Sequence, residues 1–371
     1  MGTILTRSPY FVNVTESGIV SASINIFIYE GMQTTSRPST PTYVLTDDAY
    51  DGMVSFEFAE LIKDYISTVF DGSVKTHNVW CDYQVTWSDG TTDTPLTMIQ
   101  ESASEGWGYR YEGVNPKRNN SVLMSNDIVV KNENTSFWLP ISGDTNSRVM
   151  FFKNGELKKL VDVNKTNDSS ELIQYITSDG SSFDEWYVRC LYDGAEFKNL
   201  DHIKEVLDES LELDIDKVII DSDGGSKTIY VENINEGWYD INTITFINSH
   251  GALQEMFFFK ASTTSMKVDS TNYKSTIQTG GTYNPFEHSN KILDSNGTQT
   301  MKLNSGFYPE AYNDVFTELL LSESVWLTNK GIVYPVNILT KAVDFKTHKI
   351  DQLINHELEI EFSGNIINDI R

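Results

Sequence analysis

The sequence contains only two cysteines, Cys81 and Cys190, among its 371 residues. Two cysteines so far apart exclude a disulfide framework and a cysteine-rich zinc module. Unpaired cysteines usually pack as small apolar side chains. We therefore expect two buried free thiols.

Long apolar runs are also missing. No stretch approaches the ~18 apolar residues that would span a bilayer, and the first residues hold no apolar run long enough for a signal peptide. These absences predict a soluble protein made in a cytoplasm, without a membrane partner.

Basic residues are few: 28 Lys and Arg stand against 53 Asp and Glu, a formal net charge of −25. A chain this acidic is repelled by nucleic-acid phosphates and by anionic lipid, so we expect no direct contact with either. The acidic residues are scattered along the chain, which favours a role in solubility. Complementarity to a basic partner surface and cation binding are the alternatives.

Catalytic motifs are absent as well. The sequence has no GxxxxGK[ST] or GxGxxG phosphate loop, no HExxH zinc signature and no GxSxG nucleophile elbow. Acid pairs such as Glu101/Glu105 and Asp184/Glu185 could serve glycoside hydrolysis in a depolymerase, but 53 acidic residues produce such pairs by chance. A depolymerase would also predict a repetitive β-helix, and no repeat is present. The sequence therefore predicts a protein that is not an enzyme, with no catalytic residue.

Metal and cofactor sites receive little support. A tetrahedral zinc site needs clustered ligands, whereas the histidines are dispersed: His77, His202, His250, His288, His348 and His356. Residues 221–225 resemble the start of a calcium loop, with Glu232 at the twelfth position. A hairpin turn is the favoured interpretation there, because Gly225 offers no side-chain ligand and strand-like residues follow. We expect no metal and no cofactor.

Aromatic residues are abundant, at 12% of the chain, and favour strands with large buried contacts. Strict alternation of apolar residues over 20–28 and 79–87 predicts two strands, the second ending in a turn at 88–90. Phe27 and Tyr29 fall on the polar face of the first strand, where they could form a contact patch or a lid. Other aromatics could stack on sugars, although core positions are more common: Trp80, Trp107, Trp138, Tyr109 and Tyr111.

Apolar spacing of three and four residues between Phe58 and Phe70 predicts one amphipathic helix, near residues 57–70. A helix between two strands indicates a β-sandwich-like domain at residues 1–132. The rest, residues 133–371, is expected to be a second β-sandwich-like domain that is less regular at about 140–240.

Within this second domain a short helix is expected at 202–211. Hairpins are predicted around Asn154-Gly155, at 218–231, and across Asn296-Gly297. Further strands are expected at 244–247, 256–259, 318–327 and 333–362. Residues 34–42 and 263–284 are expected to be exposed loops.

A family resemblance lies in segments that together cover about half of the chain: residues 8–11, 24–29, 56–66, 245–251, 257–259, 318–322, 325–327, 335–336 and 353–355. These segments resemble virion structural proteins of tailed bacteriophages, particularly those of Bacteroidetes hosts and crAss-like podophages. It implies a tail, neck-ring or baseplate component without a cofactor, and it transfers no functional residue.

We therefore expect a structural protein of the virion tail: a ring, collar, adaptor or fibre-attachment protein. Its expected partners are copies of itself, in a homo-oligomeric ring, and other virion tail proteins. The alternative is a receptor- or carbohydrate-binding module at the tail tip.

Overall fold

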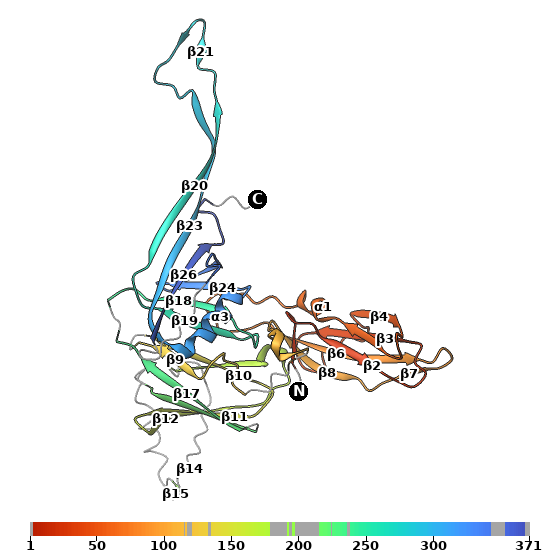
Figure 1. The fold of residues 1–371 in the computed structure, drawn as a ribbon. Coiled ribbons are helices and arrows are strands. Elements are labelled where there is room, and N and C mark those ends of the chain that lie inside the picture. Colours follow the sequence, from red (N-terminus) through yellow and green to blue (C-terminus); the bar gives the residue numbers. More distant parts are fainter. Residues whose placement is uncertain are drawn as a thin grey trace. The chain divides into compact units, whose positions relative to one another are not determined.

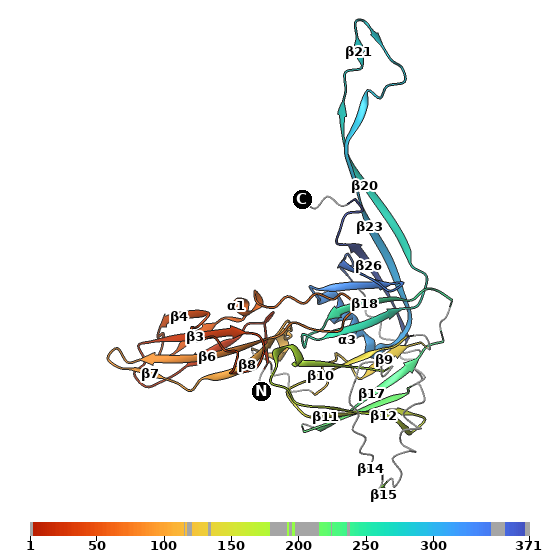
Figure 2. The same ribbon diagram turned by 180° about the vertical axis from the view of Figure 1, so that it is seen from behind.

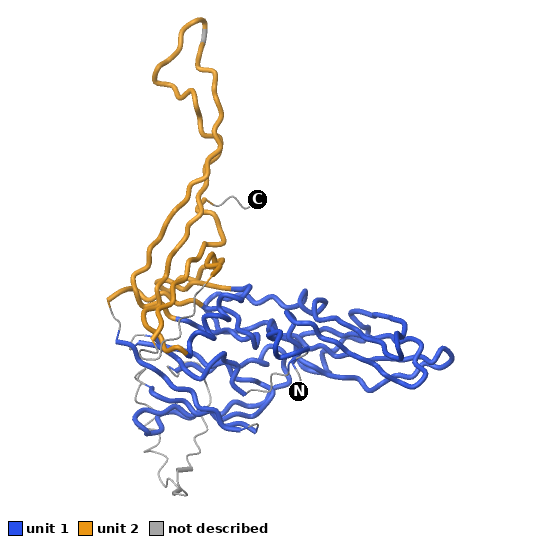
Figure 3. Tube along the Cα trace, viewed as in Figure 1, with its two compact units in different colours: residues 1–236, 245–256, 311–324 blue, residues 237–244, 257–310, 325–371 orange. Residues whose placement is uncertain are grey.

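The structure is a computed structural model that describes residues 3–114, 116, 121–132, 135–178, 191–192, 195–196, 215–223, 225–235, 238–342 and 353–367. Strands far outnumber helices in this part of the chain, which confirms the predicted mainly β fold. The chain divides into two compact units (Figure 3), one of residues 1–236, 245–256 and 311–324, the other of residues 237–244, 257–310 and 325–371. We expected two domains, at residues 1–132 and 133–371, and these bounds differ from those of the two compact units. The division into those two domains stays a prediction.

The first unit begins with a six-stranded sheet, whose order is β1-β8-β6-β3-β4, with β7 paired to β6 (Figure 1). All neighbours are antiparallel except β1 and β8, which run parallel. Its strands are β1 (Thr3–Leu5), β3 (Ser21–Tyr29), β4 (Tyr43–Asp48), β6 (Val79–Ser88), β7 (Asp93–Pro95) and β8 (Ile99–Ser104). The two strands that alternation predicted are thus β3 and β6, paired with each other.

A smaller layer packs against this sheet. It contains the antiparallel pair β2 (Phe11–Val14) and β5 (Val54–Glu57), followed by the helix α1 (Ala59–Lys63). The core between the layers joins the inward residues of β3 and β6, such as Ile24 and Cys81, to Phe56, Phe58 and Ile62. This arrangement is sandwich-like, as expected.

Helix α1 is much shorter than predicted, because the helix ends at Lys63 rather than near residue 70. Beyond a turn, the main-chain N–H of Ser67 donates to His77 Nδ1 at 3.0 Å. Ile66 and Phe70 are buried all the same, whereas Val69 is exposed. The helical spacing of apolar residues therefore spans a short helix and the irregular segment after it, both of which bury side chains. The helix does not continue because the β-branched residues at 66, 68 and 69 favour helix only weakly.

A second sheet of the first unit has the order β12-β11-β16-β17-β9, with β17 and β9 parallel. Its strands are β9 (Ile128–Lys131), β11 (Ser147–Lys153), β12 (Glu156–Val163), β16 (Lys217–Ser222) and β17 (Gly225–Asn233). The antiparallel pair β10 (Trp138–Ser142) and β13 (Ile173–Thr177) contributes Leu139, Ile141 and Ile176 to the same core. Another short pair is β14 (Leu191–Tyr192) with β15 (Ala195–Glu196).

Both hairpins predicted in this region are confirmed. Asn154 and Gly155, with φ of 52° and 82°, form the turn between β11 and β12, as a type I′ turn requires. Strands β16 and β17 pair directly, from Val218 opposite Ile229 to Ser222 opposite Gly225. The helix expected at 202–211 lies outside the described residues.

Two strands, β18 (Asn242–Ile247) and β19 (Leu253–Phe258), carry the chain from one unit into the other. They match the strands expected at 244–247 and 256–259. Short 3-10 turns lie at Arg110–Glu112, Ser169–Glu171 and Glu310–Tyr312.

The prediction of a strand across 318–327 was wrong in its first half. Residues up to Leu321 belong to helix α3 (Asn313–Leu321), and only β24 (Val325–Asn329) is a strand. Val315, Phe316 and Leu319 are buried along one side of the helix, a spacing typical of an amphipathic helix. The run of leucines at 319–321 obscured that pattern.

The second unit contributes to a seven-stranded sheet with the order β19-β18-β24-β25-β26-β23-β20, in which the pairs from β24 to β20 are antiparallel. Its further strands are β20 (Thr263–Lys274), β23 (Asn290–Pro309), β25 (Ile332–Ile338) and β26 (Leu353–Phe362). Figures 1 and 2 show β20 and β23 continuing beyond β26 as a two-stranded ribbon, with β21 (Gln278–Thr279) and β22 (Thr282–Tyr283) at its far end.

This ribbon corrects two predictions. Residues 263–274, expected to lie in a loop, form strand β20, although every one of them is exposed as expected. Asn296-Gly297, expected to be a hairpin turn, lies inside β23, opposite Asp269 and Val268. The actual turn is at Gly280 and Gly281, whose φ angles are 61° and 84°.

Candidate interaction surface

The most exposed secondary structure of the second unit is the outer part of the β20–β23 ribbon, residues 266–299, which we call the arm. Its strands pair from Met266 opposite Gln299 to Lys274 opposite Asn290, with one irregularity between Thr271 and Asn272. Among the described strands, β20 pairs with β23 alone, and β26 pairs with β23 only from Thr300 onward. The arm is therefore a ribbon of two strands.

One face of the arm carries apolar side chains. Met266 and Val268 lie two residues apart in β20 and share a face, and they are 60% and 55% exposed. Ile292, 64% exposed, lies opposite Asn272 in the register and so belongs to the same face. Met266, Val268 and Ile292 form the surface that we call the apolar stripe.

The tip of the arm adds aromatic rings. Tyr283 is 68% exposed and Phe286 is 89% exposed. Exposed apolar side chains that gather in one place are typical of interaction sites, whereas single ones are ordinary. The stripe and the tip together identify the arm as the candidate interaction surface.

The charge of the arm differs from that of the whole chain. Residues 266–299 contain three lysines (267, 274 and 291) and three acidic residues (269, 287 and 294), so their formal charges cancel, 3 − 3 = 0, while the chain carries −25. Lys267 and Asp269 form an ion pair of 3.3 Å on its surface. Another acidic copy of the chain would thus meet little net repulsion from the arm.

Sequence reasoning missed the arm because its residues include many Thr, Ser and Asn and few aliphatic residues. A short signal was present at Met266 and Val268, which alternate with the charged residues Lys267 and Asp269 at the period of a strand. The Asn-Gly pair at 296–297 misled the turn prediction. Gly297 is extended rather than in the left-handed region, and the terminal segment hydrogen-bonds to it through the Ile366 N–H.

The aromatic residues considered for sugar stacking lie mainly in the interior. Trp80 is fully buried and donates its Nε1–H to the Gly31 carbonyl at 2.8 Å. Trp107 is buried beneath the Arg7 guanidinium, 4.4 Å from the ring centre. Trp138 contacts Phe70. Tyr109 and Tyr111 stack on each other at 5.3 Å between ring centres, and Tyr111 is 84% exposed.

Phe27 and Tyr29, which were candidates for a contact patch, pack instead in a small cluster with Trp80 and Leu172. The Tyr29 hydroxyl donates to the buried Asp82 carboxylate at 2.9 Å. Both faces of β3 are therefore covered near its end.

The two residues of the acid pair Glu101/Glu105 lie in different surroundings. Glu105 accepts a hydrogen bond from Ser324 Oγ at 3.2 Å, and burial raises the pKa of its carboxyl. Glu101 lies in β8, opposite Cys81. Asp184 and Glu185 lie outside the described residues. Nothing in the described geometry of Glu101 and Glu105 marks them as a hydrolytic pair.

Within the described residues, no group of three or more His, Cys, Asp or Glu side chains could hold a metal ion. His250 and His356 are buried and His77 contacts Glu30, while His202 and His348 lie outside the described part of the chain. Residues 221–223 and 225 form the predicted hairpin rather than a calcium loop. Cys81 is a buried free thiol, as expected, and burial raises its pKa; Cys190 is outside the described residues.

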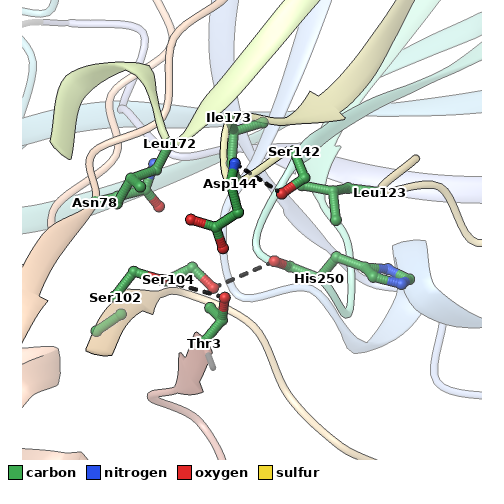
Figure 4. A pocket seen from close by; sticks show the side chains of 11 residues that line it. Thr3, Asn78, Ser102, Ser104, Leu123, Ser142, Asp144, Leu172, Ile173 and His250 are labelled. Atoms are coloured by element: carbon green, nitrogen blue, oxygen red, sulfur yellow. Dashed lines mark hydrogen bonds between the residues drawn. The ribbon is translucent and has the colours of Figure 1, made fainter. Parts of the chain in front are cut away.

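A small cavity lined by both polar and apolar residues lies within the first unit and is shown in Figure 4. Its volume is about 20 Å³, enough for a water-sized occupant. The residues around it are Thr3, Asn78, Ser102, Ala103, Ser104, Leu123, Ser142, Asp144, Leu172, Ile173 and His250. None of them was a candidate from the sequence except His250.

The described helices are all too short or too polar to span a membrane.

Comparisons with known proteins add no family. No protein-family model matches the chain, and no curated protein matches it. One solved structure that it resembles is the crystal structure of CBD12 from CALX1.2, with 13% sequence identity and a TM-score of 0.16, covering 62% of this chain and 96% of that chain. So low a TM-score carries no conclusion about fold or function.

Proposed function

We propose that this protein is a structural component of a bacteriophage tail: a ring, collar, adaptor or fibre-attachment protein that acts through contacts with copies of itself and with neighbouring tail proteins. The observation that carries the proposal is the arm, residues 266–299. The phage assignment itself is supported by the resemblance of the sequence segments to tailed-phage virion proteins.

The arm is poorly supported by its own chain. A two-stranded hairpin alone is marginally stable in water, because it buries little apolar surface. The apolar stripe of Met266, Val268 and Ile292 is exposed, and none of the described strands pairs with the outer edge of β20. Such edges readily pair with a strand of another chain. Burial of the stripe and edge against a neighbouring subunit would stabilise both.

Charge favours another copy of the chain as one such neighbour. Two copies with a formal charge of −25 repel each other over most of their surfaces. The arm, with no net charge, is a segment through which they can associate without that cost. The protein partner is therefore contacted through apolar and main-chain groups rather than through a basic patch.

Two experiments test the proposal. Mass spectrometry of purified virions of the phage that encodes this chain should find the protein in the particle, and its absence would refute the phage assignment. Sedimentation velocity of the full chain should show oligomers at micromolar concentration, reduced at least tenfold in association constant by Met266→Ser, Val268→Ser and Ile292→Ser combined.

Val69→Ser is the matched control, because Val69 is 74% exposed in the first unit and outside the arm; it should leave association unchanged. A chain that stays monomeric and binds glycans on an array, equally with and without the arm substitutions, would instead support a receptor- or carbohydrate-binding module. Exposed Tyr111 would then be the first aromatic residue to change.

A further inference from the structure

The cavity of the first unit brings together oxygen atoms from four separate stretches of chain. Thr3 belongs to β1, Ser102 and Ser104 to β8, and Ser142 to β10, while Asn78 precedes β6. In Figure 4 the Asp144 carboxylate lies at the centre, with the hydroxyls of Thr3 and Ser104 below it. A group bound here would connect the N-terminal sheet to the β10–β13 pair.

Asp144 is the charged residue of this site. Its main-chain N–H donates to Ser142 Oγ at 3.3 Å, yet its Oδ1 is buried without a hydrogen-bond partner. Burial raises the pKa of the Asp144 carboxyl, an effect that nearby positive charge, including that of Lys165, only partly offsets. No lysine or arginine lines the cavity. The carboxylate thus lacks a compensating group within the cavity.

Asn78 supplies the second unsatisfied oxygen. Its side chain is almost fully buried, at 2% exposure, and its Nδ2 donates to Thr76 Oγ1 at 3.1 Å. Its Oδ1 has no hydrogen-bond partner. A buried oxygen left unpaired destabilises the folded state, because it has lost its hydrogen bonds to water. Two such oxygens around one cavity therefore indicate an occupant that interacts with both.

The remaining polar groups also present oxygen atoms. Thr3 Oγ1 and Ser102 Oγ share a hydrogen bond of 3.2 Å, and Ser104 Oγ donates to the His250 carbonyl at 3.2 Å, which leaves the Ser104 lone pairs available. Carboxylate, amide and hydroxyl oxygens suit hard cations, and Ca²⁺ sites commonly add several carboxylates. One carboxylate with neutral oxygens matches a single positive charge instead.

We propose that this cavity binds one small monovalent cation of the size of Na⁺, held by Asp144 Oδ1, Asn78 Oδ1 and the surrounding hydroxyl oxygens. The bound ion neutralises Asp144 and fastens β1 and β8 to the chain that follows β10. A water molecule could occupy the same volume and donate to both oxygens, but it would bring no positive charge into the cavity beside the Asp144 carboxylate.

The test is the unfolding equilibrium of the full chain in NaCl and in choline chloride at equal ionic strength, since choline is too large for the cavity. A ligand that binds only the folded state raises the folded-to-unfolded ratio by 1 + [L]/Kd, about elevenfold at ten times Kd. We expect the ratio to rise with Na⁺ concentration, and Asp144→Asn to abolish that rise. Asp93→Asn, an exposed carboxylate in β7, should retain it.

Two further readouts keep the outcome clear if Asp144→Asn folds poorly. Ser104→Ala should weaken the Na⁺ dependence without removing the charge. The ²³Na resonance should broaden in the presence of the full chain and sharpen when Asp144 is replaced. Equal stability in NaCl and choline chloride, with no ²³Na broadening, would overturn the proposal and assign the cavity to water alone.

Discussion

Arg37 Nη1 lies 3.1 Å from Asp82 Oδ2, and the Asp82 side chain is fully buried while the Arg37 side chain is 28% exposed. The same carboxylate oxygen accepts from the Tyr29 hydroxyl. The ion pair therefore fastens the loop of residues 31–42 to the centre of the first sheet.

Arg37→Met should destabilise the protein by about 2–4 kcal/mol, because it leaves the buried Asp82 carboxylate without its cation. Urea unfolding measures this loss. The double variant with Asp82→Asn should recover most of it, since the charge is then removed as well. Lys158→Met, which breaks an exposed pair with Glu156, should change stability by no more than about 0.5 kcal/mol; a similar loss in both single variants would contradict the role assigned to burial.

Stability should fall in acid through His356. Burial lowers the pKa of His356 to about 4 from its usual 6.5, so the folded state holds the ring neutral where the unfolded state takes up a proton. The stability from this residue is present above pH 6.5 and is lost as pH falls to about 4, a change of about 3 kcal/mol at most.

Unfolding free energies at pH 7.5 and 4.5 measure this dependence, and His356→Phe should flatten it. Phenylalanine keeps an aromatic ring at this position, where the His356 ring packs edge-on to Tyr308 with 6.4 Å between the ring centres. If the variant and the natural chain lose the same free energy between the two pH values, the pH dependence does not come from His356.

Glu255 should make stability depend on pH in the opposite direction to His356. Burial raises the pKa of the Glu255 carboxyl well above its usual value, and its Oε2 is buried without a hydrogen-bond partner. Stability from this group is fully present below the unfolded-state pKa and is lost as pH rises through the raised one. Glu255→Gln should therefore stabilise the protein at pH 7.5, where the folded state of the natural chain holds this carboxyl at a cost.

The gain from Glu255→Gln should shrink to nothing near pH 4, where both states of the natural chain are protonated. Glu156→Gln is a suitable control, because Glu156 is exposed in β12. A gain that is constant across this pH range would show that the effect is not one of ionisation.

The sequence predicted strands well where one face is buried. Alternation in β3 and β6 identified Ile24 and Cys81 as core residues, and Asn154-Gly155 identified a turn, because period and turn chemistry are local properties. It failed where burial depends on distant partners. Ile66 and Phe70 are buried by packing outside a helix, so their helical spacing was misleading.

The arm and the cavity could not be predicted from the sequence for different reasons. Strand β20 has no buried face, so only Met266 and Val268 show the alternation that marks a strand, and its pairing with β23 spans a long sequence separation. Asp144 and Asn78 are 66 positions apart and each is an ordinary polar residue by itself. Only the folded chain places them around one cavity.

Photo-crosslinking from the tip of the arm tests the central claim most directly. A benzoylphenylalanine in place of Phe286, which is 89% exposed, should crosslink in assembled particles to a second copy of the chain or to a neighbouring tail protein. The same group at Tyr50, 87% exposed in the first unit, is the comparison for general exposure. Intermolecular products from position 286 in clear excess over position 50 are the predicted result; equal or absent crosslinking from position 286 would contradict the arm as the contact between subunits.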